Sequence, residues 1–289
     1  FGEETGRTPV ALLDGIGCDG FVWKYLERAL APDTRLVHLH YRGHGRTPVP
    51  RDPRHVSIPE LADDLQTVLD TLGIEHAVLA GHSMGVQVAL EAFRRHHERV
   101  RGLLLLCGSY GNPLRTFKGN DVLERVLPVL SFAVRRAPRF FLSAWQKMVP
   151  TRLAFALAQR VELNPELTRL EDFMPYLEHM ATVDLSLFME MLAQAGRHSA
   201  LEVLPTVDVP TLIIAGDADG FTPLSLSEKM QHAIPGAKMV VVKGGSHTAP
   251  IERPQLVNSA VQRFLRELDA AQGALAAAAA ASSAAIESA

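Results

Sequence analysis

Short apolar segments rich in Val, Leu and Ile recur along the chain, and few polar residues interrupt them. Apolar runs of about four to six residues without polar alternation are typical of strands that are buried on both faces of a parallel sheet. Such strands need helices on both faces of the sheet to cover them. The pattern predicts strands at residues 10–14, 35–40, 77–81, 102–108, 211–216 and 238–242.

Amphipathic stretches separate these runs. In residues 57–73, apolar side chains such as Leu61 and Leu65 recur at the spacing of one helix face. Ser57 is placed to cap the start of this helix, and Gly73 is placed to end it. The alternation of strands and helices predicts a doubly wound, mostly parallel α/β sheet.

The alternation is interrupted once, between residues 109 and 205. No strand-like run occurs there, and Leu, Phe and Met cluster at helical spacing. A helical insertion between two core strands is expected over the carboxyl ends of the strands, where ligands bind in such folds. We therefore predict a cap, in which most Met and Phe side chains pack the cap's own core and a minority face a substrate.

These patterns divide the chain into a first part of the core at 1–108, the cap at 109–205, a second part of the core at 206–269 and a tail at 270–289. The tail is rich in Ala and Ser and has no period of large apolar residues. Because it cannot bury enough apolar surface to fold alone, we expect it to be a frayed helical extension or disordered.

Composition narrows the classes of protein to which the chain can belong. Of its 289 residues, 47% are hydrophobic and 21% are charged, and the formal net charge is -3. Because acidic and basic residues are mixed along the chain, no surface for nucleic acid is expected. No apolar stretch reaches the roughly 20 residues that a membrane span needs.

The cysteine content bears on the compartment. Cys18 and Cys107 are too few for a disulfide framework and indicate a reducing compartment, unless the fold brings the two together. The chain begins at Phe1 and not at a methionine, so a leader peptide, if the protein had one, has already been removed. The small number of cysteines favours a cytoplasmic protein.

Ser83 lies at the point where a predicted strand changes to a predicted helix. A sharp strand-to-helix turn strains the backbone of its central residue and crowds the residues two positions away on either side. Only very small residues fit there, and Gly81 and Gly85 meet this requirement. Such a turn places the serine hydroxyl at a helix N-terminus, where free N–H groups can stabilise an oxyanion.

The segment Gly81–Gly85 (GHSMG) resembles the nucleophile elbow, G-x-S-x-G, of the α/β-hydrolase family. In that family an Asp or Glu and then a His follow the serine along the chain. Asp219 stands in the acid position of residues 216–223, which resemble the family's G-x-x-D-x-x-x-P loop. Asp217 is the alternative acid, but it directly follows a predicted strand and is expected to be a turn residue.

His247 is the predicted base. It follows the 238–242 strand in a Gly- and Ser-rich loop, and with Glu252 and Pro254 it is similar to the family's H-x-x-x-x-E-x-P pattern. A histidine suits this role because its pKa lies near physiological pH, so that it can accept and return a proton within one turnover.

The resemblance also implies an oxyanion hole made of two backbone N–H groups, those of Met84 and Ile16. Ile16 belongs to the segment Asp14–Gly17 (DGIG), which takes the place of the family's H-G-x-x motif. Asp14 stands where the family has a histidine. This difference alters the hydrogen bonding around the Ile16 N–H but does not remove that N–H, because it belongs to the backbone.

Two further histidine-containing segments are interpreted as structural. His38 and His40 share one face of a predicted strand, but no third ligand lies nearby in the sequence, so a metal site is not expected. Residues 41–47 (YRGHGRT) resemble the family's loop after the second core strand and are interpreted as a turn.

The resemblance covers residues 9–268 and implies a serine hydrolase of the α/β-hydrolase fold that cleaves a carboxylic ester through an acyl-enzyme. Ser83 would attack the carbonyl, His247 would move the proton and Asp219 would orient the imidazole. The apolar cap favours a hydrophobic small-molecule ester, and neither a metal nor an organic cofactor is expected. Residues 1–8 would be the remnant of the family's antiparallel first strand.

Other uses of the same residues remain open. A thioesterase, a hydrolase of carbon–carbon bonds or a cofactor-free perhydrolase would need the same triad, and a ligand-binding receptor could be built on the same scaffold. Haloalkane dehalogenases and epoxide hydrolases of this fold are disfavoured because they use an aspartate where this chain has Ser83. Nothing in the sequence indicates an oligomeric state.

Overall fold

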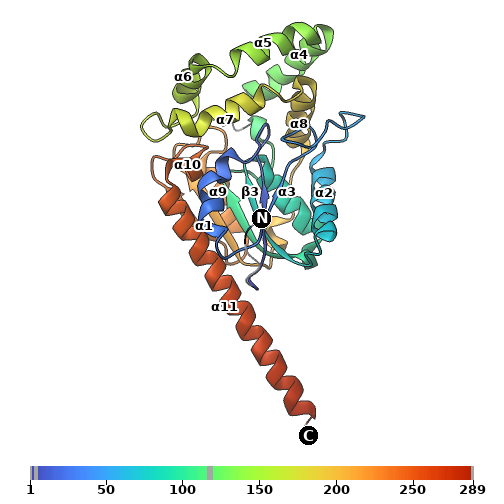
Figure 1. Ribbon diagram of the computed structural model, residues 1–289, viewed down its shortest axis with the longest axis vertical. Coiled ribbons are helices and arrows are strands. Elements are labelled where there is room, and N and C mark those ends of the chain that lie inside the picture. Colours follow the sequence, from blue (N-terminus) through green and yellow to red (C-terminus); the bar gives the residue numbers. More distant parts are fainter. Residues whose placement is uncertain (1, 3–5, 116–119, 288–289) are drawn as a thin grey trace.

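The computed structural model describes residues 2, 6–115 and 120–287 of the chain. In the described residues the strands form one parallel sheet in the order β2-β1-β3-β4-β5-β6. The predicted doubly wound α/β sheet is therefore confirmed (Figure 1). The strands are β1 (Val10–Leu13), β2 (Leu36–Leu39), β3 (Ala77–His82), β4 (Val100–Leu106), β5 (Thr211–Gly216) and β6 (Lys238–Val242).

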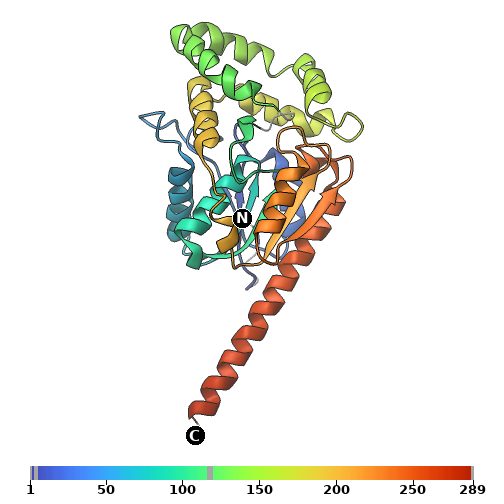
Figure 2. The ribbon, with the colours of Figure 1, turned by 180° about the vertical axis from the view of Figure 1, so that it is seen from behind.

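Helices cover both faces of this sheet (Figures 1 and 2). One face is packed by α2 (Ile58–Thr71), α3 (Met84–Arg95) and α9 (Leu224–Ala233). The other face is packed by α1 (Lys24–Leu30) and α11 (Pro254–Glu287). Short helices complete the core at Phe21–Trp23, His97–Arg99, Leu204–Thr206 and Ala249–Glu252, the last of which is α10.

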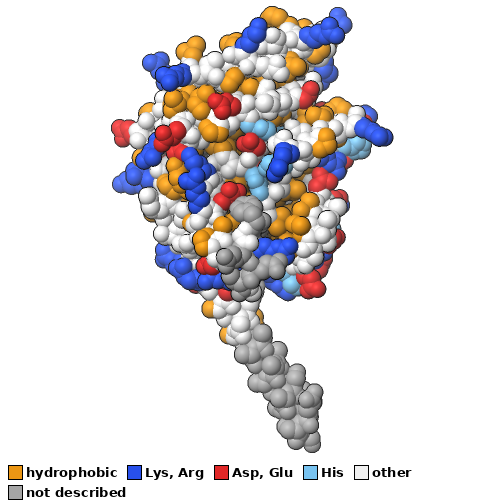
Figure 3. Space-filling model, in the orientation of Figure 1, with side chains coloured by type: hydrophobic (Ala, Val, Ile, Leu, Met, Phe, Trp, Pro, Cys, Tyr) orange, Lys and Arg blue, Asp and Glu red, His pale blue; other side chains and the backbone are white. Residues whose placement is uncertain are grey.

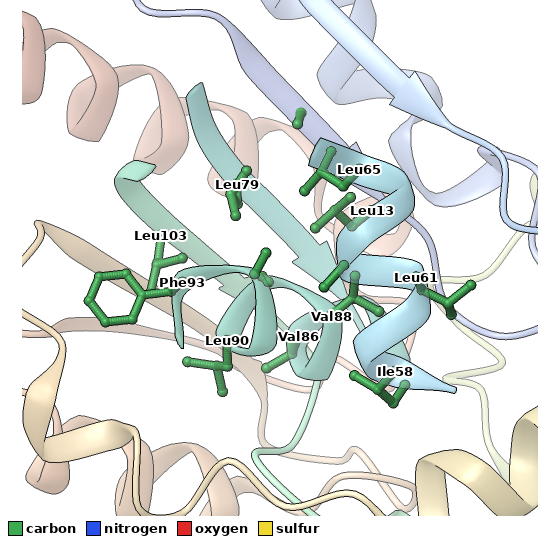
Figure 4. Close-up of a cluster of buried hydrophobic side chains, with 14 of the residues drawn as sticks. Leu13, Ile58, Leu61, Leu65, Leu79, Val86, Val88, Leu90, Phe93 and Leu103 are labelled. Atoms are coloured by element: carbon green, nitrogen blue, oxygen red, sulfur yellow. The ribbon is translucent and has the colours of Figure 1, made fainter. Parts of the chain in front are cut away.

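The unbroken apolar strands divide their side chains between these two layers. In β4, Leu103 and Leu105 belong to the layer of α2, α3 and α9, whereas Leu104 and Leu106 belong to the layer of α1 and α11. Figure 4 shows the first layer, in which side chains of α2 and α3 pack against those of the strands. Burial on both faces is the reason that these strands contain no polar alternation.

The strand β6 is not buried on both faces along its whole length. It pairs only with β5, and Val241 in it is 41% exposed. A strand at the sheet edge lacks a neighbour on one side, so its apolar side chains are less completely covered.

Helix α2 begins and ends as its sequence predicts. The Ser57 hydroxyl accepts a hydrogen bond from the Glu60 N–H, and the Glu60 carboxylate accepts one from the Ser57 N–H. This reciprocal pair satisfies two N–H groups that the helix leaves without partners. Gly73 follows the helix with a φ of +65°, a conformation that glycine adopts without steric cost.

Between β4 and β5 the chain forms a layer of helices over the carboxyl ends of the strands (Figure 1, top). We call this segment the cap. It is held to the core by Asp172, whose buried carboxylate accepts hydrogen bonds from Lys24 and from Tyr25 in α1. The cap helices are Pro113–Arg115, α4 (Val122–Arg136), α5 (Pro138–Met148), α6 (Arg152–Val161), α7 (Leu170–Met180) and α8 (Leu185–Arg197).

At the N-terminal end the structure differs from the sequence-based expectation, and at the C-terminal end it agrees with one of the two alternatives. The antiparallel strand predicted at 1–8 falls partly on residues 1 and 3–5, which lie outside the described residues, and residues 2 and 6–8 are not in a strand. Of the two alternatives for the tail, the helical extension agrees with the structure, in which α11 continues through the Ala-rich segment to Glu287. Alanine has the highest helix propensity, so nothing in the tail ends the helix.

None of the described helices is both long and apolar enough to cross a membrane.

Candidate active site

Ser83 lies between the end of β3 and the start of α3, in a strained backbone conformation with φ 56° and ψ -117°. A Cβ atom on Gly81 would lie 2.3 Å from the Gly85 carbonyl oxygen. A Cβ atom on Gly85 would lie 2.1 Å from the Leu13 carbonyl oxygen. Both positions therefore require glycine, for the steric reason that the sequence indicated.

The structure brings Ser83 next to His247, although 164 positions separate them in the chain. The Ser83 hydroxyl lies 2.9 Å from His247 Nε2, to which it can donate its proton. On the other side of the ring, His247 Nδ1 lies 2.9 Å from Asp219 Oδ2 and 3.2 Å from Oδ1. These contacts form a continuous hydrogen-bonded chain from hydroxyl to imidazole to carboxylate.

Asp219 is held by its own loop. Its carboxylate accepts hydrogen bonds from the N–H groups of Phe221 and Thr222, at 2.9 and 2.8 Å, and from the Thr222 hydroxyl at 2.8 Å. The rival acid, Asp217, lies elsewhere and accepts a hydrogen bond from the Gly244 N–H. Of the two candidate acids, the geometry joins Asp219 to His247.

This arrangement shifts the pKa values of both partners. Burial acts to lower the pKa of His247, but the negative charge of Asp219 and its hydrogen bond outweigh burial, so that the pKa is raised. Burial acts to raise the pKa of Asp219, but the charge of His247 and the hydrogen bonds from His247 and Thr222 lower it below its usual range. The carboxylate is therefore ionised at neutral pH.

The loop that carries His247 is fixed by Glu252 of α10. Its buried carboxylate accepts hydrogen bonds from the Ser246 N–H and hydroxyl, at 2.7 and 2.6 Å, and from the Thr248 hydroxyl at 3.1 Å. The same carboxylate accepts a hydrogen bond from Thr168 of the cap, at 2.7 Å. Glu252 thus joins both neighbours of His247 to the cap.

His82, inside the elbow motif, also forms a hydrogen bond with the backbone of His247. This role of His82 is not predicted from the sequence. Its Nε2 lies 2.9 Å from the His247 carbonyl oxygen. Burial lowers the pKa of His82 to about 4, so the ring is neutral at pH 7 and Nε2–H donates this hydrogen bond. In the sequence, the position of His82 directly before Ser83 is the feature that indicates such a role.

The predicted oxyanion donors lie beside Ser83. Met84 is the first residue of α3, so its N–H has no acceptor within the helix. Ile16 follows Gly15, where a Cβ atom would lie 3.0 Å from Ser83 Cβ. Ile16, Ser83 and Met84 line the same cavity. The loop of Gly15 and Ile16 therefore passes close to the serine.

Asp14, which replaces the family's histidine, has a structural role of its own. Its buried carboxylate accepts a hydrogen bond from Trp23 Nε1 at 2.8 Å and lies 2.8 Å from His38 Nε2. Burial acts to lower the pKa of His38, but the hydrogen bond and charge of Asp14 outweigh it and raise the pKa. The interpretation of His38 as structural agrees with this contact.

A second histidine, His44, holds the loop that precedes Cys18. Its Nε2 accepts a hydrogen bond from the Gly17 N–H at 3.0 Å, and Nδ1 lies 3.1 Å from the Arg42 carbonyl oxygen. Burial lowers the pKa of His44 to about 4, so the ring is neutral and can both accept and donate. The segment 41–47, interpreted from the sequence as a turn, therefore also holds the loop of the predicted oxyanion donor Ile16.

A cavity of about 430 Å³ lies between Ser83 and the cap. Most of its lining is apolar, including Phe173, Met180 and Phe188 of the cap. Among the described residues that line it, Glu162 is the only Asp, Glu, Lys or Arg, and its negative charge contributes to raising the pKa of His247.

The two cysteines are separate, buried thiols. Burial raises the pKa of both Cys18 and Cys107 well above the usual range, so neither forms a thiolate readily. Within the described ranges, no group of three or more His, Cys, Asp or Glu side chains is arranged to bind a metal ion.

A parallel sheet with a strained serine, a histidine and an aspartate at its carboxyl edge is the architecture of a hydrolase. The chain belongs to the alpha/beta hydrolase fold family, whose family model matches residues 8–254. The chain is therefore a hydrolase of this family.

Individual relatives carry different names. A protein of Azorhizobium caulinodans named "Putative carbamate hydrolase RutD" is 30% identical over 268 residues, which are 91% of this chain and 92% of that protein. The solved structure of a thermophilic esterase from Thermogutta terrifontis matches with a TM-score of 0.70 and 25% identity, over 91% of this chain and 90% of that one. An enol-lactonase from Burkholderia xenovorans, at 24% identity and a TM-score of 0.71 over 92% of this chain and 94% of that one, shares the fold.

Proposed function

We propose that the protein hydrolyses a hydrophobic carboxylic ester through an acyl-enzyme formed on Ser83. The observation that carries the proposal is the 2.9 Å contact between Ser83 Oγ and His247 Nε2, at the floor of an apolar cavity. A serine hydroxyl is a weak nucleophile at neutral pH, so the adjacent imidazole is needed to take its proton.

In the first half of the reaction, Ser83 Oγ attacks the ester carbonyl carbon while His247 Nε2 accepts the hydroxyl proton. The carbonyl oxygen becomes an oxyanion, which the N–H groups of Ile16 and Met84 stabilise. Asp219 keeps Nδ1 protonated and stabilises the imidazolium. His247 then gives the proton to the departing alkoxide, and the acyl group remains on Ser83.

In the second half, water takes the place of the alcohol. His247 accepts a proton from the water as it attacks the acyl carbon, and then returns that proton to Ser83 Oγ. The carboxylic acid leaves, and the enzyme returns to its starting state. Each step uses the same two N–H donors, because each passes through an oxyanion.

The cavity supports the choice of substrate class. Its apolar lining stabilises a hydrophobic acyl or alcohol group by removing that group from water. The name of the Thermogutta esterase supports an ester, and that of the Azorhizobium relative makes a carbamate the second candidate. Either carbonyl compound would pass through the same acyl-transfer steps.

The test is the hydrolysis of a p-nitrophenyl ester series, from acetate to long acyl chains, by the wild type and by Ser83→Ala. We expect kcat to fall roughly 10⁴- to 10⁶-fold in Ser83→Ala, as for loss of a triad nucleophile. Ser225→Ala, at an exposed serine of α9, is the control and should retain full activity.

A second panel of thioesters, β-diketones and aryl carbamates separates the alternatives. An ester preference with a covalent acyl-Ser83 detected by mass spectrometry would support the proposal. Full activity in Ser83→Ala, or no turnover of any ester, would contradict it. Tight ligand binding by the wild type without turnover would favour a receptor.

We also infer that the protein acts in a reducing compartment such as the cytoplasm. Cys18 and Cys107 are both buried and are not joined to each other. Proteins of oxidising compartments more often use such residues in disulfides.

A further inference from the structure

The outer surface of the cap exposes large apolar side chains. Phe140 in α5 is 70% exposed and Leu153 in α6 is 80% exposed, and Phe132 and Val129 in α4 are also exposed. Scattered single apolar residues are common on protein surfaces, but a group of this size on adjoining helices indicates an interaction surface. Figure 3 shows apolar side chains at this end of the molecule.

Helical spacing shows that these side chains are not part of the cap core. In α6, Leu153, Leu157 and Val161 recur every four residues and form one exposed stripe. Phe155, on the other side of the helix, is buried against the core. The helix is therefore apolar on two faces, and only one of them is covered by the protein itself.

The same helices are strongly basic. Between residues 122 and 161 there are seven Lys or Arg residues and one acidic residue, Glu124, whereas the whole chain has a net charge of -3. In the part of the chain that the structure describes, no acidic group lies within ion-pair distance of six of these exposed basic side chains. They are Arg135, Arg136, Arg139, Lys147, Arg152 and Arg160.

We propose that this surface of α4, α5 and α6, which we call the docking face, binds the surface of an anionic lipid bilayer. Apolar side chains on such a face enter the boundary between headgroups and acyl chains, while Lys and Arg contact the anionic headgroups. A second copy of the chain is a poorer partner, because two faces with this excess of positive charge repel each other.

The docking face adjoins the catalytic cavity. An apolar groove of about 390 Å³ between α4, α5 and α8 is lined by Val126, Leu130 and Met148, each of them exposed. Trp145 and Phe188 line both this groove and the cavity above Ser83. If the proposed function is correct, an apolar ester can pass from the bilayer to the serine along this groove.

The experiment is co-sedimentation of the full chain with vesicles, without substrate, so that its result does not depend on the proposed function. Vesicles of phosphatidylcholine alone are compared with vesicles that contain one third phosphatidylglycerol. We expect binding to the anionic vesicles at least 10-fold tighter than to the neutral ones, and weaker binding at 0.5 M salt because ions screen the headgroup charge.

Two double variants test the two parts of the face. Arg139→Glu with Arg152→Glu removes basic charge, and Phe140→Ser with Leu153→Ser removes apolar area. Each is expected to weaken binding to anionic vesicles at least 10-fold. Neither pair lines the cavity, and a circular dichroism spectrum and a thermal unfolding midpoint equal to those of the wild type show that the variants are folded.

The matched control carries Leu256→Ser and Arg266→Glu, two exposed positions of α11 on the core. It should bind vesicles as the wild type does. Equal binding to neutral and anionic vesicles, wild-type binding by both test variants, or no binding at all would overturn the proposal. A dimer in sedimentation velocity that both test variants dissociate would instead assign the face to a second copy of this chain.

Discussion

The backbone of Ser83 is strained, and Gly81 and Gly85 on either side of it lie where a larger side chain would not fit. Its φ of 56° is one of two positive values among the described non-glycine residues, the other being that of Cys107. Such strain costs on the order of 1–3 kcal/mol and persists only where the surroundings enforce it. Here the enforcing contacts are the close approaches of Gly81 to Gly85 and of Gly85 to Leu13.

Replacing Gly85 tests this packing. In Gly85→Ala, the new methyl group would collide with the Leu13 backbone, so we expect the free energy of unfolding to fall by about 1–3 kcal/mol and the proposed ester hydrolysis to fall with it. Urea denaturation measures the first effect. The control is Gly273→Ala in α11, where no atom lies within 4 Å of the added Cβ and a helical alanine should stabilise by roughly 0.5–1 kcal/mol. Equal stability of wild type and Gly85→Ala would contradict the steric argument.

The raised pKa of His247 predicts the pH dependence of the proposed activity. Only the neutral imidazole can take the Ser83 proton, so kcat/KM should fall as the pH is lowered through the raised pKa, which lies above 6.5. In Asp219→Asn, the charge that raises the pKa is lost, so this acid limb should move to lower pH. The activity itself should drop about 10⁴-fold.

Both the pH of the acid limb and the loss of activity are measured from kcat/KM between pH 4 and pH 9 for the wild type and Asp219→Asn. The control is Asp217→Asn, which changes the nearby acid that does not contact His247. An acid limb that stays at the same pH in Asp219→Asn would show that another group sets the pKa.

Among the helices and loops, the segment after β6 that carries His247 is held by hydrogen bonds to α10, and α10 is also bonded to the cap. Ser246 and Thr248 flank His247, and both donate hydrogen bonds to Glu252. Because Thr168 and the Asn164 N–H contact the same carboxylate, the loop and the cap segment share one acceptor. The position of the base is thus coupled to the position of the cap.

Glu252→Gln tests Glu252 as a positioning residue. The amide keeps the shape of the side chain but replaces one acceptor oxygen by a donor, so some of these hydrogen bonds are lost. We expect kcat to fall roughly 10- to 100-fold with little change in KM, because a small displacement of the base affects the transition state more than substrate binding. Steady-state kinetics of the ester series measure this split.

Glu228→Gln, at an exposed glutamate of α9, is the control and should leave both constants unchanged. A rise in KM alone for Glu252→Gln would mean that Glu252 shapes the substrate site and does not position the base.

In the assembled molecule, buried polar side chains join the cap to the core. Asp172 of α7 is buried and contacts Lys24 and Tyr25 of α1. On the opposite side, Gln87 of α3 donates a hydrogen bond to the Ala195 carbonyl of α8. These contacts connect the cap to helices on both faces of the sheet.

Asp172→Asn tests the first of these contacts. Loss of the charge weakens the bonds from Lys24 and Tyr25, and we expect the free energy of unfolding to fall by about 1–3 kcal/mol. Faster hydrogen exchange in α7 with unchanged exchange in β3 would show that the cap loosens locally. Glu171→Gln, at the exposed neighbouring position, is the control. Equal exchange in α7 for Asp172→Asn and wild type would contradict the anchoring role.

Features that depend on residues close together in the chain can be predicted from the amino-acid sequence. Apolar runs predicted the parallel strands, the Ser57 cap and Gly73 predicted the limits of α2, and the two glycines beside Ser83 predicted the elbow. Each rests on backbone geometry within a few residues, which local residue types control. The order of Ser83, Asp219 and His247 along the chain also predicts that these three side chains form a triad.

Contacts between residues that are far apart in the chain follow from the folded structure and not from local sequence patterns. It selected Asp219 over Asp217, joined His44 to the oxyanion loop and gave Glu252 partners on both sides of His247. It also placed β6 at the sheet edge and left the outer face of α6 uncovered. These outcomes depend on strand order and on the packing of the cap, so they follow from contacts between segments that local sequence patterns do not contain.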